Sequence, residues 1–277
     1  MGNLDGLGYR DKTVVVTGGA SGMGEATARL LGELGAKVHI VDIQQPNVDC
    51  ESFHQCDLSD FAQVRATAEA LKAIALIHFL FPCAGLPPHV KGPMYCMRVN
   101  YIGTRHFVEN LLPSLADGAG IALISSDAAL GWQKNLQQSL EMLAISDPDE
   151  AYAWCEADPD NRVRDGYTSS KEMLAVWVQN AAVELGNTRR IRLNAIGPCP
   201  TKTAFVDMSS EIMTDEFIAA WPFPSLGRMA TAEEQAWPLI LLNSPLNGAV
   251  SGSFLYTDQG FASGVYTGAI SAAFMGG

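Results

Sequence analysis

The sequence predicts an α/β fold built on a doubly wound parallel sheet with helices on both faces. Short β-branched or apolar runs alternate with longer helical patterns from residue 13 to about residue 257, which is typical of a parallel sheet covered by helices. The first run leads directly into a glycine-rich turn and a helical pattern. With 277 residues and 48% hydrophobic content, the chain can build one substantial core.

Each predicted strand is a run of five to eight residues dominated by β-branched, aromatic or aliphatic side chains, and each predicted helix fills a longer interval between two such runs. In chain order, the predicted strands are Thr13–Thr17, Lys37–Asp42, Ile74–Phe81, Gly120–Ser125, Ile191–Ile196 and Ser253–Thr257. The predicted helices are Gly22–Leu34, Phe61–Ala73, Gly103–Leu115, Ser169–Gly186 and Thr231–Leu242.

Two segments interrupt this alternation. One, at about residues 131–165, carries helix-like pieces at Leu136–Ala144 and Asp149–Ala157, and the other, at about residues 200–229, is rich in Met, Phe and Pro. Both follow strand carboxyl ends, where open α/β sheets bind ligands. We interpret them as a helical insertion and a substrate loop of a single catalytic domain, residues 1–277, because no linker rich in Pro, Gly or Ser divides the chain.

The composition disfavours several classes of protein. Lys and Arg number 18 against 30 Asp and Glu, a net charge of −12, whereas binding to nucleic acid needs clustered positive charge. No apolar stretch reaches the ~18 residues that span a bilayer, and the N-terminus has no apolar signal core. The six cysteines are scattered without a C-x-x-C pair. We therefore expect a cytoplasmic protein with free thiols and without a metal site, a membrane segment or a nucleic-acid partner.

The turn after the first strand reads Thr-Gly-Gly-Ala-Ser-Gly-Met-Gly, from Thr17 to Gly24. Glycines let the backbone approach a pyrophosphate, and the following helix supplies N–H donors and a partial positive charge. Asp42 ends the second strand, where a carboxylate accepts hydrogen bonds from ribose hydroxyls and repels a 2′-phosphate. The residues after it are neutral, so we predict NAD rather than NADP. An ordinary αβ turn and a turn-forming aspartate are the alternatives.

Tyr167 and Lys171 stand four residues apart in a helical pattern, which places them on one face of the helix. A nearby ammonium favours the phenolate and lowers the phenol pKa from its ordinary value near 10. Such a tyrosine can act as a general acid or base. The spacing also arises by chance between two surface side chains, so the neighbouring motifs decide between the two interpretations.

These motifs together resemble those of the short-chain dehydrogenase/reductase family, whose members are built on one Rossmann-type domain. The resemblance extends from Thr13 to about Gly260 and includes the G-x-x-x-G-x-G spacing of that family. It implies a catalytic tetrad of Asn100, Ser126, Tyr167 and Lys171, which match in order and local context. Ser125 is the competing choice for the serine, and Ser126 is preferred because the family's serine follows the final small residue of the strand.

The resemblance also implies a dinucleotide site. Asp57 matches the residue placed against the adenine, Cys83 replaces the asparagine of the family's N-A-G turn, and Cys199 stands where glycine is usual. The implied cofactor-binding residues are Gly18, Ser21, Gly22, Met23, Gly24, Asp42, Asp57, Leu58, Cys83, Ala84, Gly85, Tyr167, Lys171, Pro198, Thr201 and Thr203.

The activity implied is the NAD-dependent interconversion of a secondary alcohol and a ketone. Tyr167 would exchange the hydroxyl proton, Ser126 would steady the substrate oxygen, Lys171 would lower the Tyr167 pKa and hold the nicotinamide ribose, and Asn100 would anchor a water. Alternatives are a reductase of sugars or acyl thioesters and, in another class, a non-catalytic dinucleotide-sensing protein.

The length of the segment between Ser126 and Tyr167 resembles that of the bacterial 3α-hydroxysteroid dehydrogenase/carbonyl reductase subgroup. The resemblance implies a bulky apolar alicyclic substrate such as a hydroxysteroid, with a terpenoid or aryl secondary alcohol as the alternative. It also implies an insertion that covers the helices through which most relatives dimerise. A homodimer or homotetramer is expected, with the apolar tail Phe261–Met275 packed on a neighbour. Side chains that either line an apolar pocket or belong to the core are Trp132, Trp154, Phe205, Met208, Met213 and Trp221.

Overall fold

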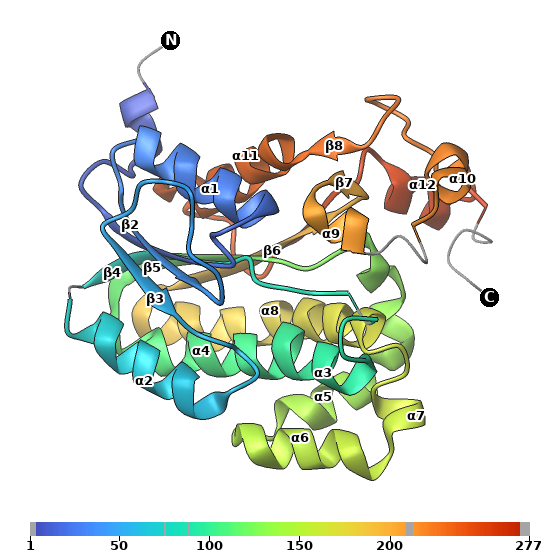
Figure 1. Ribbon diagram of the computed structural model, residues 1–277, viewed down its shortest axis with the longest axis horizontal. Coiled ribbons are helices and arrows are strands. Elements are labelled where there is room, and N and C mark those ends of the chain that lie inside the picture. Colours follow the sequence, from blue (N-terminus) through green and yellow to red (C-terminus); the bar gives the residue numbers. More distant parts are fainter. Residues whose placement is uncertain (1–3, 75, 88, 209–212, 272–277) are drawn as a thin grey trace.

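A parallel sheet of seven strands forms the centre of the molecule in the computed structural model, which describes residues 4–74, 76–87, 89–208 and 213–271 (Figure 1). Within the described residues, the strand order is β3-β2-β1-β4-β5-β6-β9, and every neighbouring pair is parallel. The predicted doubly wound fold is confirmed. The strands are β1 (Thr13–Thr17), β2 (Lys37–Asp42), β3 (Ser52–Gln55), β4 (Ile77–Pro82), β5 (Leu115–Ile124), β6 (Arg192–Pro198) and β9 (Phe254–Thr257).

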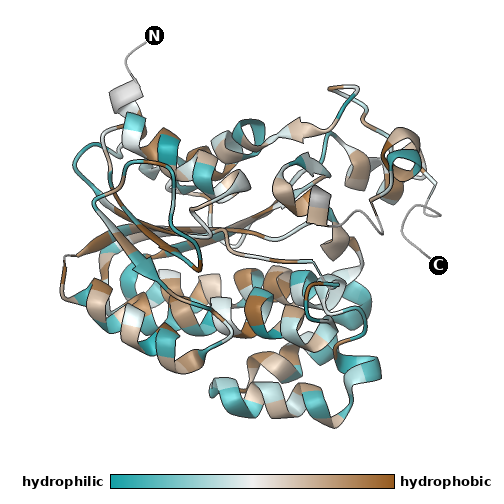
Figure 2. Ribbon diagram, in the orientation of Figure 1, coloured by the Kyte–Doolittle hydropathy of each residue, from teal (hydrophilic) through white to brown (hydrophobic). Residues whose placement is uncertain are grey.

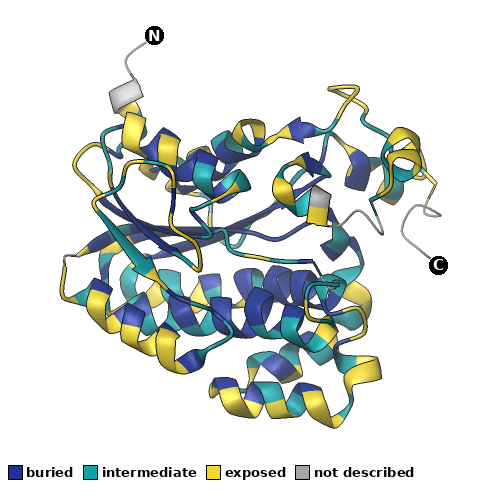
Figure 3. Ribbon diagram, viewed as in Figure 1, coloured by how far each residue is buried: buried dark blue, intermediate teal, exposed yellow. Residues whose placement is uncertain are grey.

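Helices cover both faces of the sheet. On one face, α1 (Gly22–Glu33) packs beside α11 (Ala232–Asn243), and on the other lie α2 (Phe61–Lys72), α4 (Thr104–Leu111) and α8 (Tyr167–Arg189) (Figure 1). Hydrophobic residues are frequent in the sheet, while the surrounding helices carry many hydrophilic ones (Figure 2). β1 and β6 are buried along their whole length (Figure 3), because both their faces contact helices. In β1, Val15 joins one core while Val14 and Val16 join the other.

The predicted strand boundaries hold best where both faces of the strand are buried. β1 and β2 have the predicted bounds, whereas β3 has no counterpart among the predictions. Its four residues at the sheet edge are only half buried or exposed, so they lack a continuous apolar run. β4 begins at Ile77 instead of Ile74, since Ile74 is exposed. β5 begins five residues early, at Leu115, with an irregular register beside β4.

The helical region begins ten residues before Gly103, the start that the sequence predicts. α3 (Pro93–Met97) continues into a π-helical turn, Arg98–Gly103, and then into α4. Pro93 stands at the first position of α3, where its missing N–H costs nothing. A Cβ on Gly103 would lie 2.0 Å from the Leu58 carbonyl oxygen, so this close approach requires glycine.

The segment at residues 131–165 forms helices where the sequence predicts them. α5 (Leu136–Leu143), α6 (Pro148–Ala157) and the short α7 (Pro159–Arg162) lie against the layer that contains α3, α4 and α8 (Figure 1). The Arg105 guanidinium of α4 donates hydrogen bonds to the carbonyls of Met142, Leu143 and Ile145 at the end of α5. The insertion is therefore packed on its own chain.

The second irregular segment lies beyond the carboxyl end of β6. It contains a two-stranded parallel pair, β7 (Thr201–Lys202) and β8 (Ala230–Thr231), with α9 (Ala204–Met208) and α10 (Asp215–Ala220) between them. α12 (Phe261–Thr267) follows β9. Residues 209–212 of the predicted substrate loop and residues 272–275 of the predicted apolar tail lie outside the described residues, as do the two residues that follow. The short 3-10 segments are Leu4–Leu7, Leu112–Ser114, Asp127–Asn135 and Pro245–Asn247.

Neither a transmembrane helix nor a metal-binding cluster occurs in the described part of the chain. None of its helices is both long and apolar enough to cross a bilayer, and none of its His, Cys, Asp and Glu side chains form a group of three or more that could hold a metal ion.

We predict that Gly166→Ala destabilises the protein by at least about 2 kcal/mol. Gly166 precedes α8 with φ 75°, and a Cβ there would lie 2.2 Å from the Pro93 carbonyl oxygen. Gly186→Ala is the matched control within α8, where no atom lies within 4 Å of an added Cβ; it should stabilise by about 0.5–1 kcal/mol. Equal denaturation midpoints for the two variants would contradict this account.

Candidate active site

The candidate site includes the turn after β1 and the turn after β4, which lie in contact with each other. A Cβ on Gly18, which has φ 69°, would lie 2.6 Å from Ala84 Cα, and a Cβ on Gly24 would lie 2.1 Å from the Gly18 carbonyl oxygen. Larger residues at these two positions would separate the turns. The glycines thus bring the start of α1 close to the segment Cys83–Gly85 that follows β4.

These turns line a cavity at the carboxyl edge of the sheet that is open to solvent, with about 1070 Å³ of empty space when the open part is included. Asp42 lies at its wall, where its carboxylate accepts hydrogen bonds from the N–H groups of Ala20 and Gln44, both at 3.0 Å. Most of the predicted cofactor-binding residues line this cavity, namely Gly18, Ser21, Gly22, Met23, Gly24, Asp42, Leu58, Cys83, Ala84, Gly85 and Thr203.

Asp57 is placed differently from its neighbour Leu58. Its carboxylate accepts hydrogen bonds from the Ser59 N–H at 2.8 Å and from the Tyr95 hydroxyl at 3.2 Å. Cys56 and Leu58 line the cavity, while Asp57 is not among the residues at its wall. Adenine contact by the Asp57 side chain stays a prediction; each carboxylate oxygen accepts one of these bonds and has a further lone pair to offer.

A second cavity, with about 870 Å³ of empty space when its solvent-open part is included, adjoins the first. The residues that line both are Met23, Cys83, Gly85, Thr203 and Phe205. The second cavity collects the remaining predicted groups from the ends of several elements. They are Ser126 after β5, Tyr167 and Lys171 in the first two turns of α8, and Pro198, Thr201 and Thr203 after β6. The structure therefore brings together three of the four predicted catalytic side chains in one place.

The two candidate serines have different partners. The Ser125 hydroxyl donates to the backbone carbonyl of Lys171 at 2.9 Å. Ser126 instead donates to Asp127 Oδ1 at 3.0 Å, and its hydroxyl lies near enough to Tyr167 to lower the pKa of that phenol in part. Ser125 has a role in fixing α8 against β5, whereas Ser126 faces the reactive phenol.

Tyr167 is the first residue of α8 and contacts Ser126, Lys171 and Phe205. Burial raises the pKa of its phenol, and the nearby Ser126 hydroxyl offsets only part of that increase. The predicted lowering of this pKa is wrong as a net effect. Loss of solvent disfavours the phenolate, and Lys171 Nζ lies 5.5 Å from the ring centroid.

Lys171 is itself deeply buried. Its ammonium donates to the Ile124 carbonyl at 3.2 Å. Burial lowers the pKa of Lys171 to about 8, against a smaller opposing effect of Cys96 and Cys83. The side chain therefore holds its proton weakly for a lysine, which suits a group that shares a proton with its surroundings.

Asn100 lies in the π-helical turn and is buried. Its amide pairs with the Leu86 backbone in both directions, since Leu86 N–H donates to Oδ1 and Nδ2 donates to the Leu86 carbonyl, each at 2.9 Å. A Cβ on Gly85 would lie 3.5 Å from both Asn100 Oδ1 and Lys171 Nζ. Asn100 and Lys171 are thus both neighbours of Gly85. Asn100, unlike Lys171, does not line the second cavity.

Asp127 is a site residue that the sequence reasoning missed. It accepts the hydrogen bond from Ser126 and lines the second cavity. Burial raises the pKa of its carboxyl to about 7, and the Ser126 hydrogen bond lowers it in part. Its position directly after the serine at a strand end was the available signal, but an acidic residue there usually forms a turn.

The wall opposite Tyr167 is apolar. Phe205 lies with its ring centroid 5.6 Å from that of Tyr167, and Met213 and Trp221 also line the second cavity, as predicted. Phe217 joins them without having been singled out. Met208 lines the first cavity instead, and Trp132 and Trp154 line neither. Trp154 packs against the core and stacks under the Arg162 guanidinium, 4.2 Å from its ring centroid.

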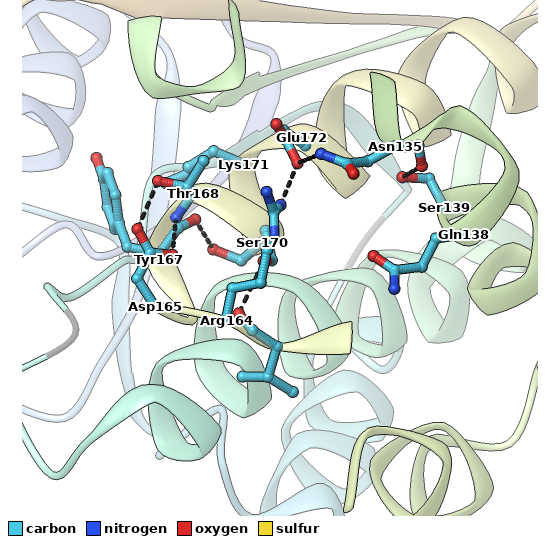
Figure 4. Close-up of polar contacts among 12 residues, drawn as sticks. Asn135, Gln138, Ser139, Arg164, Asp165, Tyr167, Thr168, Ser170, Lys171 and Glu172 are labelled. Carbon is cyan, nitrogen blue, oxygen red and sulfur yellow. Dashed lines mark hydrogen bonds and ion pairs between the residues drawn. The ribbon is translucent and has the colours of Figure 1, made fainter. Parts of the chain in front are cut away.

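Both ends of the insertion are tied to α8 beside Lys171. Figure 4 shows Glu172 of α8 between Asn135, which donates at 2.9 Å, and Arg164, which forms an ion pair with it. Burial raises the pKa of Glu172, while Arg164 and Asn135 lower it in part. These contacts fix the insertion at its start and at its end.

The fold and the site define an α/β oxidoreductase class in which a glycine turn suited to a dinucleotide adjoins a serine, a tyrosine and a lysine. Residues 12–137 match the family model described as short chain dehydrogenase, and residues 159–262 match one described as Enoyl-(Acyl carrier protein) reductase. The chain belongs to the short-chain dehydrogenase/reductase family.

Two curated relatives match over most of their length. A coniferyl-alcohol dehydrogenase of Pseudomonas sp. (strain HR199 / DSM 7063) is 30% identical over 253 residues, which cover 91% of this chain and 97% of the relative. A 3-alpha-hydroxysteroid dehydrogenase/carbonyl reductase of Comamonas testosteroni is 30% identical over 255 residues, 89% of this chain and 95% of the relative. Among solved structures, the 3-alpha-hydroxysteroid dehydrogenase from Pseudomonas sp. B-0831 complexed with NADH has a TM-score of 0.77 at 24% identity and covers 94% of this chain and 100% of its own.

We predict that Ser126→Ala lowers kcat for dehydrogenase turnover by about 10²- to 10³-fold, because a donor next to the reacting oxygen is lost. Ser125→Ala is the matched control. It should change kcat by less than about tenfold while costing about 1 kcal/mol of stability, because its hydroxyl bonds only backbone. Steady-state kinetics and denaturation of both variants test the assignment, which is wrong if Ser125→Ala shows the larger loss of kcat.

Proposed function

We propose that the protein is an NAD-dependent oxidoreductase that interconverts a secondary alcohol and a ketone, with the whole chain acting as one catalytic domain. The observation that carries this proposal is the arrangement of Ser126, Tyr167 and Lys171 around one cavity that adjoins the glycine turn. We further propose a cytoplasmic homodimer or homotetramer, in line with the family resemblance.

The first cavity suits a dinucleotide. The pyrophosphate would lie over Gly18, Gly22 and the start of α1, where N–H donors and the helix dipole favour an anion. The Asp42 carboxylate can accept hydrogen bonds from the adenosine ribose and repels a 2′-phosphate. Ile43 and Gln44, which follow it along the wall, carry no charge. These features favour NAD over NADP.

NAD supplies hydride transfer at nicotinamide C4 when it is bound. The chain supplies the proton chemistry. Tyr167 exchanges a proton with the substrate oxygen, and Ser126 lies beside that oxygen to steady its developing charge. Lys171, near Gly85 and Tyr167, is placed to hold the nicotinamide ribose. Asn100 would anchor a water between Lys171 and solvent.

The substrate cavity favours a bulky apolar molecule. Phe205, Met213, Phe217 and Trp221 form its wall, and they can exclude water from the reacting centre. Two similar proteins are named as 3-alpha-hydroxysteroid dehydrogenases, which supports a hydroxysteroid as the first candidate. The similarity to a coniferyl-alcohol dehydrogenase supports an aryl alcohol as the second, and a terpenoid alcohol fits the same wall.

A non-catalytic dinucleotide sensor is the alternative of another class. It would bind NAD without turning over any secondary alcohol. Formation of NADH with a panel of hydroxysteroids, cyclic terpenols and aryl carbinols separates the two functions, since the sensor would give none.

We predict that Tyr167→Phe lowers kcat by at least about 10³-fold, because the proton-exchanging hydroxyl is removed. The affinity for NAD, measured by calorimetry, should change by less than about twofold, since the ring stays in place. Tyr152→Phe makes the same change on the insertion and should keep full turnover. Retained oxidation of a secondary alcohol by Tyr167→Phe would contradict the assignment.

We predict that Asp42→Ala reduces the preference for NAD over NADP by roughly tenfold or more, expressed as the ratio of kcat/KM values. The change removes the charge that repels the 2′-phosphate and the acceptor for the ribose. Asp49→Ala removes the same charge from an exposed position outside the cavity and should leave the ratio unchanged. An unchanged ratio in Asp42→Ala would show that another group selects the cofactor.

A further inference from the structure

Asp57 lies beside the first cavity and has a carboxylate that takes no part in the proposed chemistry. Cys56 and Leu58, its neighbours in the sequence, line that cavity together with Val90. These three wall residues are uncharged, so they suit the faces of an aromatic base. Asp57, which is half-buried, brings a negative charge to the margin of this wall.

The hydroxyl of Tyr95, in the middle of α3, joins this carboxylate to two other polar groups. It donates to Asp57 Oδ2 at 3.2 Å, and it accepts from Lys91 Nζ and from Ser59 Oγ, both at 3.3 Å. A phenol has one proton and two lone pairs, so these three contacts use its full hydrogen-bonding capacity. The Lys91 ammonium also lies 4.4 Å from the centroid of the Tyr95 ring, which favours the same side-chain position.

The charged groups at the two ends determine the direction of these hydrogen bonds. An ammonium can only donate and a carboxylate can only accept, so the Tyr95 proton has to point at Asp57, and the Ser59 hydroxyl has to donate. The other oxygen of the carboxylate, Oδ1, accepts from the Ser59 N–H at 2.8 Å. The Asp57 carboxylate is therefore held by one donor on each oxygen.

Held in this way, Asp57 offers acceptors to a ligand and withholds its own donor. Each carboxylate oxygen has a further lone pair, whereas the Asp57 backbone N–H already donates to Gln63 Oε1 at 3.1 Å. A ligand group that donates a hydrogen bond is favoured at this position. A ligand carbonyl oxygen would instead face acceptors and be repelled.

On the basis of the proposed function, we propose that Tyr95 is a positioning residue that fixes the Asp57 carboxylate, so that the site selects a dinucleotide whose base carries a 6-amino group. Adenine presents an exocyclic amine with two N–H donors at this position, whereas hypoxanthine presents a carbonyl oxygen. The family resemblance leads us to expect only a contact between Asp57 and adenine. The role of Tyr95 follows from the hydrogen bonds of this chain.

The backbone that carries Tyr95 is itself packed firmly. Pro93, two residues earlier in α3, has its carbonyl oxygen against Gly166 at the start of α8. Cys96, the next residue, donates from Sγ to the Leu86 carbonyl at 3.3 Å. The hydroxyl is therefore presented to Asp57 from a helix with tertiary contacts on two sides, which suits a residue that has to hold another in place.

The test is the affinity of the wild type, Tyr95→Phe and Tyr152→Phe for NAD and for nicotinamide hypoxanthine dinucleotide, measured by calorimetry. The two ligands share the nicotinamide, both riboses and the pyrophosphate, so the ratio of their Kd values isolates the base. The wild type should bind NAD about 10- to 100-fold more tightly, because an amine on a carboxylate is replaced by a repelled oxygen.

Tyr95→Phe should reduce this ratio by about fivefold or more, because the carboxylate loses one of its two fixed donors. Tyr152→Phe removes the hydroxyl of another half-buried tyrosine, which does not line the cavity, and should keep the ratio. A purely structural role of Tyr95 would weaken the binding of both dinucleotides equally, and an unchanged ratio in Tyr95→Phe overturns the proposal. A wild type that binds both equally also overturns it and leaves the proposed function intact, whereas a wild type that binds neither overturns both.

A second variant, Asp57→Ala, keeps the proposal testable if Tyr95→Phe fails to fold. It truncates a half-buried side chain and removes the acceptors that Tyr95 holds in place. The ratio of the two Kd values should then fall to about one. An unchanged ratio in Asp57→Ala overturns the proposal, because another group would then select the base.

Discussion

The positions of the reactive groups depend on the first turn of α8. Gly166 adopts a left-handed conformation against the Pro93 carbonyl, and this allows the helix to begin at Tyr167. Because the helix begins there, Tyr167 and Lys171 lie on one face, with the Ser125 hydroxyl holding the Lys171 carbonyl to the end of β5. A shift of this turn would move the phenol and the ammonium together, away from the serine that stays on the sheet.

The parallel direction of the strands positions the other residues of the site. All seven strands are parallel, so the segments that follow β1, β4, β5 and β6 meet at one edge. The turns after β1 and β4 form much of one cavity, and the segments after β5 and β6 form much of the other. Met23, Cys83, Gly85, Thr203 and Phe205 line both. The topology thus places the proposed cofactor and substrate cavities side by side, while the particular side chains decide the chemistry.

The sequence predicted the strands and site residues that local patterns and motifs mark. The features that it missed depend on the tertiary surroundings of the residues. β1 and β2 were located correctly because buried parallel strands are continuous β-branched runs, while β3 was missed because an edge strand with half-buried residues has no such run. The site residues were named from motifs, and the structure collects most of them. The raised pKa of Tyr167 was missed because it follows from burial, which no local pattern of residues records. Asp127 was missed because an acidic residue directly after a strand usually forms a turn.

The contacts of Glu172 with Asn135 and Arg164 have a consequence for how this protein can evolve. They fasten the two ends of the insertion to the same point of α8, so the residues between them form a closed excursion that starts and finishes beside the active helix. Within the segment, Met142, Ala151 and Cys155 are buried in the core that α8 shares, so only its exposed positions can change without disturbing the packing beneath them. The exposed face of this segment can therefore vary in sequence while the position of α8 is kept.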